Sequence, residues 1–363
     1  MTVGIVYDPI YLEHQTGTDP ESPSRLIAIM NFLKEKGVLE DPNYTFIKPR
    51  KASLDQIRYV HDDQMIKEIQ EISELSAKTQ HIQYLDADTA ASPKTYEASL
   101  YSVGGNLQAA DEILDGNIRN AFALVRPPGH HSDSHRFAGF CIFNNIAVTA
   151  EYLLREKGIK RIAIIDWDCH HGNGTQSIFY YGSESESGEL VIFNSQQYGF
   201  FYPGSGNYDE IGKGKGAGKI INYPMPAGTA EDAIPIFFEE IISPICYEFK
   251  PEFILISAGF DTHWSDSLTN MNWTYQAPAR YLEMIKTIAS KFANDRILIT
   301  LEGGYAIDKQ ARAVYNCLKI LNNENDKLIE EESRTSRKEL LEYFNQRLIP
   351  ALKNKLQPYW DCF

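Results

Sequence analysis

Short apolar runs, most of them rich in β-branched residues, recur along almost the whole chain and are separated by longer mixed stretches. A short continuous apolar run is typical of a strand that is buried on both faces, and the mixed stretches between the runs predict helices. Strands that alternate with helices form a mostly parallel sheet that helices cover on both faces. We expect eight strands, at 2–7, 44–47, 121–125, 162–165, 190–194, 219–223, 253–257 and 297–301.

No repeat, low-complexity tract or long linker divides these elements. We therefore predict a single α/β domain over residues 1–363, with an eight-stranded, mostly parallel sheet flanked by helices. C-terminal helices at about 308–355 are expected to pack on that domain.

The composition excludes some classes of function. A net charge of −14 disfavours direct binding to nucleic acid and is compatible with cationic substrates. Five cysteines, an odd and scattered set, do not form a disulfide framework, which favours a reducing compartment. Neither a secretory signal nor an apolar run of membrane-spanning length is visible, so a cytoplasmic protein without membrane contact is expected.

The stretch 162–175, IAIIDWDCHHGNGT, combines a buried strand with an abrupt polar end. Alternate side chains of an extended chain share one face, so Asp168 and His170 can reach the same metal ion. A set of oxygen and nitrogen ligands suits Zn²⁺ or another borderline divalent metal. The competing interpretation is a solvated strand end that leads into a turn.

Polar residues follow three further strands, and the ends of parallel strands lie on one edge of a sheet. Asp261 is the natural third ligand, although an Asp after Gly259 could equally form a turn. Tyr305, after two glycines, could swing inward or could be an ordinary packed aromatic. Two adjacent imidazoles in a Pro/Gly-held loop suggest proton transfer, with metal ligation as the alternative. The residues at these four strand ends are His130 and His131; Asp166, Asp168 and His170; Asp261; and Glu302 with Tyr305.

The motifs RPPGHH, GFCIFNN, IDWDCHHGNGTQ, YPGSG, SAGFD and LEGGY occur in this order. Together they resemble the zinc-dependent histone deacetylase superfamily, which includes lysine deacetylases and acetylpolyamine amidohydrolases. The resemblance extends from about Val6 to about Asn316 and implies the arginase/deacetylase fold.

The resemblance also implies roles for individual residues. It gives one Zn²⁺ to Asp168, His170 and Asp261, and a structural K⁺ to Asp166, Asp168 and main-chain oxygens near His170 and Ser195. His130 and His131 become the general base and acid, Asp166 orients His130, and Tyr305 donates to the substrate carbonyl oxygen. The residues implied in substrate binding are Asp88, Gly139, Phe140, Tyr202 and Leu268.

Three positions qualify the resemblance. Asn173 stands where some branches have an Asp beside the second histidine, and Glu302 fits the same class II-like branch. Leu268 occupies a rim position that is acidic in one polyamine deacetylase, which weakens the polyamine interpretation without removing it.

We therefore expect a zinc-dependent deacetylase that uses metal-activated water, with a small preference for acetylated polyamines over acetyl-lysine. A protein lysine deacetylase of the histone type is the alternative. A catalytically silent module that binds an acetylated ligand, and a binuclear manganese hydrolase of the arginase type, are further alternatives. The sequence leaves a homodimer open.

Overall fold

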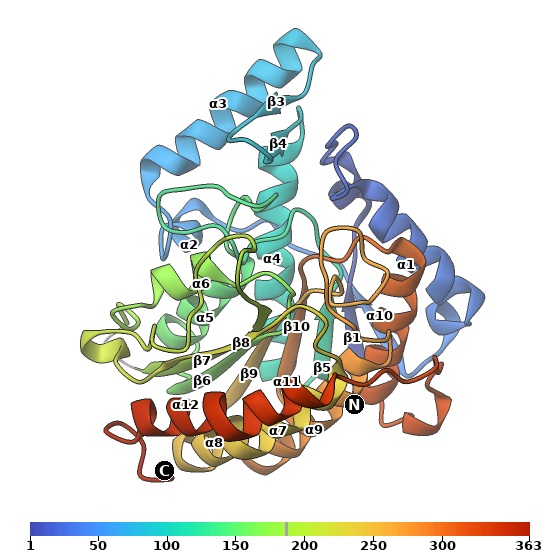
Figure 1. Ribbon diagram of the computed structural model, residues 1–363. Helices are drawn as coiled ribbons and strands as arrows, with labels where there is room; N and C mark the ends of the chain where they lie inside the picture. The colour runs from blue at the N-terminus through green and yellow to red at the C-terminus, as the bar shows by residue number, and fades with distance from the viewer. Residues whose placement is uncertain (186–187) are drawn as a thin grey trace.

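The computed structural model describes residues 1–185 and 188–363. Its centre is an eight-stranded sheet in the order β2-β1-β5-β10-β9-β6-β7-β8, and every neighbouring pair of strands is parallel (Figure 1). The fold class and all eight strands expected from the sequence are therefore confirmed. The strands are β1 Thr2–Val6, β2 Tyr44–Ile47, β5 Ile118–Ala123, β6 Arg161–Asp166, β7 Glu189–Gln197, β8 Ile220–Met225, β9 Phe253–Ala258 and β10 Ile297–Leu301.

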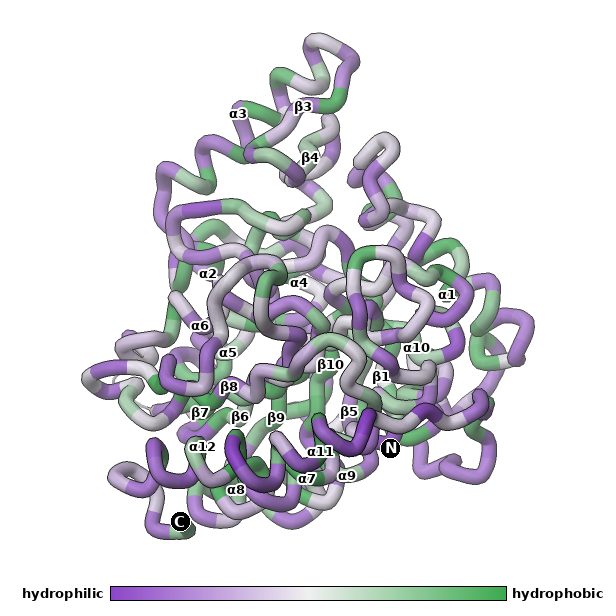
Figure 2. The backbone as a smooth tube through the Cα atoms, in the orientation of Figure 1, coloured by the Kyte–Doolittle hydropathy of each residue, from purple (hydrophilic) through white to green (hydrophobic). Residues whose placement is uncertain are grey.

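The central strands are buried on both faces, which explains their continuous apolar runs. Every residue of the adjacent central strands β9 and β10 is buried, and hydrophobic residues concentrate in the middle of the molecule (Figure 2). Such strands gain stability from apolar burial on either side rather than from one amphipathic face.

Helices cover the sheet. Figure 1 shows α7, α8, α9, α11 and α12 along its lower side, while α4 and α5 pack against each other and on the strands. The helices are α1 Pro23–Glu35, α2 Leu54–Ile57, α3 Asp63–Thr79, α4 Thr95–Leu114, α5 Asn145–Arg155, α6 Asn173–Ile178, α7 Ile234–Phe237, α8 Ser243–Phe249, α9 Ala277–Phe292, α10 Ile307–Leu321, α11 Lys338–Tyr343 and α12 Ile349–Leu356.

The sequence explains where one helix begins and where two helical segments are interrupted. Helix α5 begins at Asn145, because the side chain of Asn144 accepts a hydrogen bond from the Ala147 amide and caps the helix there. The helical segments 234–249 and 338–356 are each interrupted by a π-helical turn, directly before α8 and α12. Both of these helices carry a proline in their first turn, and proline cannot donate to the preceding turn.

Residues 83–91 form a small hairpin. Strands β3 (Gln83–Tyr84) and β4 (Ala90–Ala91) pair antiparallel, and together with α3 they project from the body of the molecule (Figure 1). Two residues per strand are too few to leave a periodic signal in the sequence.

The order of the strands determines where polar chemistry can gather. Strands β5, β10, β9 and β6 are four consecutive neighbours in the sheet. Residue Asp166, the last of β6, is in register with Ser257 of β9, and Leu301 of β10 is in register with Ala258. The four polar strand ends noted in the sequence therefore lie side by side at one edge. Within the described residues no helix has both the length and the apolar character needed to cross a bilayer.

Candidate active site

Asp168, His170 and Asp261 meet at this edge. The first two follow β6 and the third follows β9. Nδ1 of His170 lies 2.9 Å from Oδ2 of Asp261 and 3.2 Å from Oδ1 of Asp168. One ligand atom from each residue lies within 4.8 Å of the other two. These are the three ligands expected from the sequence, and the fold brings them together.

The electrostatics of the three residues favour a bound cation. Burial and the neighbouring charge of Asp168 raise the pKa of Asp261 to about 7. Although burial opposes it, hydrogen bonds to Asp168 and Asp261 raise the pKa of His170 to about 10. Two adjacent buried carboxylates are costly unless positive charge accompanies them, and two carboxylates with one imidazole nitrogen suit Zn²⁺. The donor set therefore fits the implied metal.

Two glycines allow the backbone to approach the carboxylates. A Cβ at Gly259 would lie 2.0 Å from Oδ2 of Asp168, and one at Gly303 would lie 2.7 Å from Oδ2 of both Asp168 and Asp261. The amide of Gly303 donates to Oδ2 of Asp168 over 2.9 Å, and the amide of Cys169 donates to Oδ1 of Asp261. Main-chain groups thus hold both carboxylates in place.

His130 and His131 lie beside the three ligands, with ring centroids 4.0 Å apart. Nδ1 of His130 is 2.9 Å from Oδ2 of Asp166, and Nδ1 of His131 is 2.7 Å from Oδ1 of Asn173. A carboxylate and an amide oxygen both accept, so each ring carries its proton on Nδ1. The hydrogen-bond partners of the two imidazoles differ in charge.

The pKa values of the two imidazoles move in opposite directions. Burial opposes charge on His130, but Asp166 and Asp168 raise its pKa to about 10. Burial, followed by the positive charge of His130, lowers the pKa of His131 well below its usual value. At neutral pH the pair therefore combines a protonated and a neutral imidazole.

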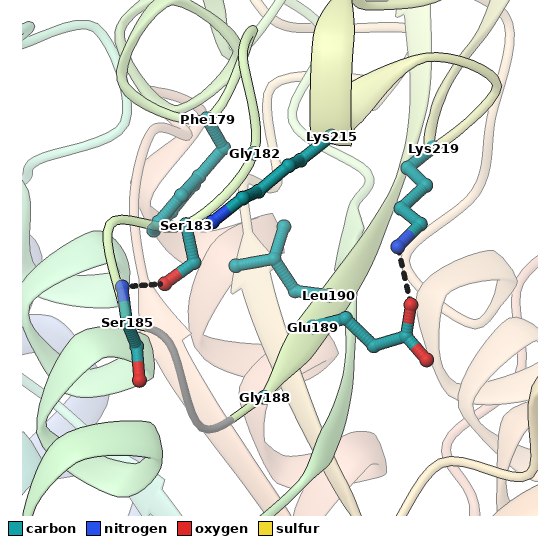
Figure 3. A pocket seen from close by; sticks show the side chains of 9 residues that line it. All are labelled: Phe179, Gly182, Ser183, Ser185, Gly188, Glu189, Leu190, Lys215 and Lys219. Carbon is teal, nitrogen blue, oxygen red and sulfur yellow. Dashed lines mark hydrogen bonds and ion pairs between the residues drawn. The ribbon is translucent and has the colours of Figure 1, made fainter.

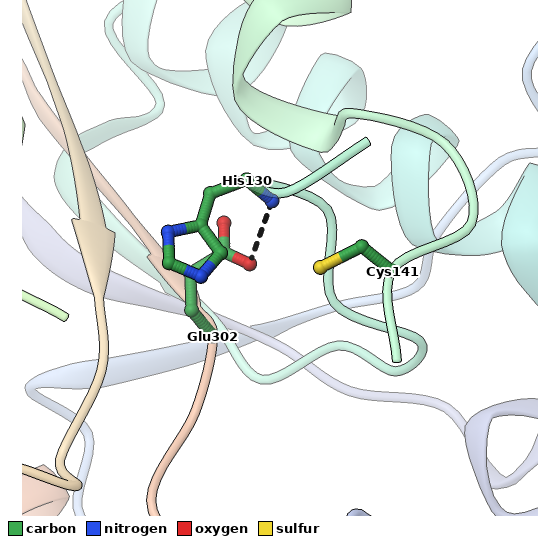
Figure 4. Close-up of side chains that lie close together, drawn as sticks. All are labelled: His130, Cys141 and Glu302. Atoms are coloured by element: carbon green, nitrogen blue, oxygen red, sulfur yellow. Dashed lines mark hydrogen bonds between the residues drawn. The ribbon is translucent and has the colours of Figure 1, made fainter. Parts of the chain in front are cut away.

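Glu302 holds the loop that carries the two histidines, a contact that the sequence did not predict. Its Oε2 accepts from the amides of Gly129 (2.8 Å) and His130 (3.2 Å), and Oε1 accepts from the Ser257 hydroxyl. Figure 4 shows this carboxylate against the main chain of His130, with the Cys141 thiol nearby. An acidic residue at a buried strand end before two glycines was the available signal.

A cavity of about 440 Å³ leads from the surface to these groups. His131 and His170 line it, whereas His130 does not, so His131 is the imidazole of the pair that a ligand in the cavity would meet. All five residues expected to bind substrate line it as well. The lining residues are Asp88, His131, Gly139, Phe140, His170, Phe200, Phe201, Tyr202, Leu268 and Tyr305.

Aromatic rings form the wall of the cavity. Phe140 stands edge-on to Tyr305 at 5.9 Å, and Tyr202 stands edge-on to His131 at 5.2 Å. Phe201, which the sequence did not single out, stacks on His170 at 4.9 Å. Gly139 has φ +54°, and a Cβ there would lie 2.4 Å from the His131 ring, so only glycine fits.

Tyr305 is fixed through its backbone and its ring. Oδ2 of Asp266 accepts from the amides of Tyr305 (2.7 Å) and Ala306 (3.0 Å). The Arg25 guanidinium lies 5.2 Å from the centre of the Tyr305 ring and donates to the carbonyls of Gly304 and Glu302. Burial raises the pKa of the Tyr305 phenol well above its usual value, so the hydroxyl keeps its proton.

The mouth of the cavity has an acidic and an apolar side. Asp88 is half-buried there, and burial together with the charge of Asp86 raises its pKa. On the apolar side, Phe200 is fully exposed and Leu268 is 39% exposed.

Buried acceptors also lie beside Asp166, on β7. Asn194, which is in register with Asp166, has an Oδ1 without a hydrogen-bond donor, and so has Oε1 of Gln196, as far as the described residues go. Acceptors that face no donor are typical of a site for a cation.

A second hollow, of about 330 Å³, lies at the opposite edge of the sheet, near the beginnings of β7 and β8 (Figure 3). Lys215 and Lys219 line it, and Lys219 is paired with Glu189. It shares no lining residue with the cavity above.

Comparisons with known proteins agree with this geometry. Residues 19–321 match the model of the histone deacetylase domain. The chain is 38% identical over 309 residues to a probable deacetylase of Archaeoglobus fulgidus, covering 85% of this chain and 82% of that protein. It is 31% identical over 360 residues to histone deacetylase HDA1 of Saccharomyces cerevisiae, covering 95% of this chain but 49% of the yeast protein. The crystal structure of the HDA15 HD domain superposes with a TM-score of 0.86 at 28% identity, covering 99% of this chain and 96% of that one.

Proposed function

The chain belongs to the histone deacetylase family, and from this membership and the site geometry we propose that it hydrolyses acetyl groups from acetylated amines. The observation that carries the proposal is the cavity whose inner end is lined by His131, His170 and Tyr305, beside Asp168 and Asp261.

Asp168, His170 and Asp261 would hold one Zn²⁺. When bound, a zinc ion supplies Lewis acidity that polarises an amide carbonyl and acidifies water. A structural K⁺ would bind Asp166, Asp168 and main-chain oxygens near His170 and Ser195. The acceptors of Asn194 and Gln196 that lack donors among the described residues support a cation in that region.

His131 is the proposed general base. Asn173 holds the proton of this imidazole on Nδ1, which leaves Nε2 as an acceptor in a ring that lines the cavity. The same nitrogen would then return the proton to the leaving amine. His130, paired with Asp166, would contribute positive charge beside the reacting carbonyl.

Tyr305 is the proposed oxyanion donor. Its phenol is protonated and lines the cavity, and its main chain is fixed by Asp266. A hydroxyl held in this way can donate to the carbonyl oxygen as negative charge develops there, without a cost of reorganisation. Phe140 and Tyr202 would grip the thin aliphatic stem that carries the acetylated nitrogen.

The residues at the mouth of the cavity influence which acetylated amine can enter it. The carboxylates of Asp86 and Asp88, with the net charge of −14, favour the cationic tail of an acetylated polyamine as the first candidate. The exposed Phe200 and Leu268 favour an acetyl-lysine peptide, which offers apolar surface to contact them, as the second.

A substrate panel on zinc-reconstituted protein tests the proposal. We expect acetate release from acetylputrescine, acetylspermidine or acetyl-lysine peptides, with inhibition by a hydroxamate. A large preference for peptides would exclude the polyamine candidate. Bound zinc without turnover on any substrate would leave a binding module, and two manganese ions per chain would favour a binuclear hydrolase.

A further inference from the structure

Residues 328–336, which we call the strap, connect η6 (Asn325–Lys327) to α11 without regular secondary structure. They lie beyond residues 19–321, the part that matches the family model. The strap is anchored at both ends. Asn316 of α10 exchanges two hydrogen bonds of 2.8 Å with the main chain of Ile329, and Ser336 donates twice to Asp232 near the start of α7.

Between these anchors the strap contacts the segment that carries the third metal ligand. We call residues 261–273 the ligand loop. The loop contains Asp261 at its start, Asp266, which holds the main chain of Tyr305, and Leu268 at the mouth of the cavity. It therefore reaches three different parts of the proposed site.

The carboxylate of Glu331 binds the base of the ligand loop. Its Oε1 accepts from Nε1 of Trp264 over 2.8 Å, while Oε2 lies 3.1 Å from Nε2 of His263 and accepts from the Tyr275 amide over 3.2 Å. The main chain of Glu331 also exchanges two hydrogen bonds with the side chain of Gln276, of 2.6 and 3.1 Å. His263 is 3% exposed and Glu331 17%, so the contact between these two side chains is largely shielded from water, whereas Trp264 is 42% exposed.

A second strap residue holds the other side of the same loop. Arg334 donates to Oδ1 of Asn272 over 2.8 Å, and its guanidinium lies 4.1 Å from the centre of the Trp264 ring. Within the loop, the Trp264 amide donates to the carbonyl of Trp273 over 2.9 Å. The strap thus contacts both arms of the loop close to the point where they meet.

We propose that Glu331 is a positioning residue, through which the strap holds the ligand loop so that Asp261, Tyr305 and the mouth keep their mutual geometry. This inference rests on the proposed function for its catalytic consequence. A charge-assisted contact to two side chains and one amide, made from a distant segment, removes freedom that the loop would otherwise have. Small displacements of catalytic groups by a remote substitution can lower turnover by about 10²-fold.

The test compares Glu331→Ala and Glu331→Gln with Glu332→Ala in the full chain loaded with zinc. Glu332 is exposed, so its substitution makes the same change in charge beside the contact. We expect Glu331→Ala to lower kcat by about 10–100-fold, to release zinc faster to a chelator and to speed amide exchange at 261–275. Glu331→Gln, which can still accept from Trp264 but not also from the Tyr275 amide, should recover part of kcat, and Glu332→Ala should match the unsubstituted protein.

Unchanged kcat, zinc retention and loop exchange in Glu331→Ala would overturn the proposal. So would faster exchange spread over the whole sheet, because Glu331 would then support the fold rather than the loop. Should the unsubstituted protein hydrolyse no acetylated amine, the proposed function fails. Zinc retention and loop exchange would still test the strap.

Discussion

Oδ1 of Asn173 lies 2.7 Å from Nδ1 of His131, and this contact determines which nitrogen of that ring is free. An amide oxygen can only accept, so the ring proton stays on Nδ1 and Nε2 has a lone pair. The neighbouring His130 has a carboxylate in the equivalent place, at 2.9 Å. A neutral and a charged partner thus give two adjacent histidines different chemistry.

Asn173→Asp should therefore change the pH dependence of the reaction. A carboxylate beside Nδ1 favours the protonated ring and raises the pKa of His131, which is now lowered by burial and by His130. A base must be unprotonated, so the acidic limb of kcat/KM should move to higher pH. Profiles of kcat/KM against pH for the variant and the unsubstituted protein measure the shift.

His131→Ala removes the proposed base and should therefore lower kcat by about 10²-fold or more. Near-normal turnover in this variant would exclude His131 as the base.

Tyr305→Phe should leave the fold intact and remove most of the deacetylase activity. The ring contacts with Phe140 and Arg25 remain, while the hydroxyl donor is removed. We expect kcat to fall by about 10²–10³-fold with KM little changed, as for other oxyanion donors. Steady-state kinetics beside a thermal melt would check this, and an unchanged kcat would contradict the assigned role.

Glu302→Gln tests whether the Glu302 carboxylate holds the loop that carries His130 and His131. The carboxylate accepts from two amides and one hydroxyl, and an amide side chain cannot accept at both ends. An unpaired buried donor costs about 1–3 kcal/mol, so urea unfolding should show a loss of that size together with a lower kcat. If the variant and the unsubstituted protein had equal stability and equal kcat, the loop would be held without the Glu302 carboxylate.

Gly139→Ala should damage the site more than the fold. The new methyl group would meet the His131 ring at 2.4 Å, and the backbone is left-handed there. The left-handed conformation costs roughly 1–2 kcal/mol for a residue with a side chain, whereas displacement of His131 would also misplace the proposed base. Gly37→Ala, at a φ of +72° with open space around it, is the matched control for backbone strain alone. Similar kinetics for both variants would argue against a special role of Gly139.

Stability should decline with acid through a buried group of charges near α1. Burial opposes it, but Arg126 and Arg25 lower the pKa of Glu21 from 4.5 to about 2, so its contribution is lost as pH falls from 4.5 towards 2. Burial and the charge of Arg126 lower the pKa of His14 from 6.5 to about 3. Between pH 6.5 and 3, His14 therefore binds a proton in the unfolded chain but not in the folded one, so stability is lost over this range.

Each group changes the unfolding free energy by about 1.4 kcal/mol per pH unit within its own window. Urea unfolding at pH 7.5, 6, 5 and 4 measures the slope, and His14→Gln should reduce it between pH 6.5 and 4.5. A slope that is unchanged in His14→Gln would refute the assignment.

The sequence predicted the sheet because buried parallel strands leave continuous apolar runs, and it predicted convergence because such strands end on one edge. It could not predict contacts that depend on tertiary packing. Arg25 donates to the carbonyl of Gly304 across 279 residues, and Glu331 reaches Trp264 across 67. The stack of Phe201 on His170 was likewise hidden, because one aromatic in an aromatic-rich loop resembles its neighbours.

The glycines beside the proposed metal ligands leave no room for substitution at the inner end of the site, since any side chain at Gly259 or Gly303 would collide with a carboxylate. Phe200 and Leu268 are exposed at the other end of the same cavity. Variant libraries of this protein should therefore randomise the residues at the cavity entrance and keep those at its inner end. Substrate preference could then change while the proposed catalytic residues stay as they are.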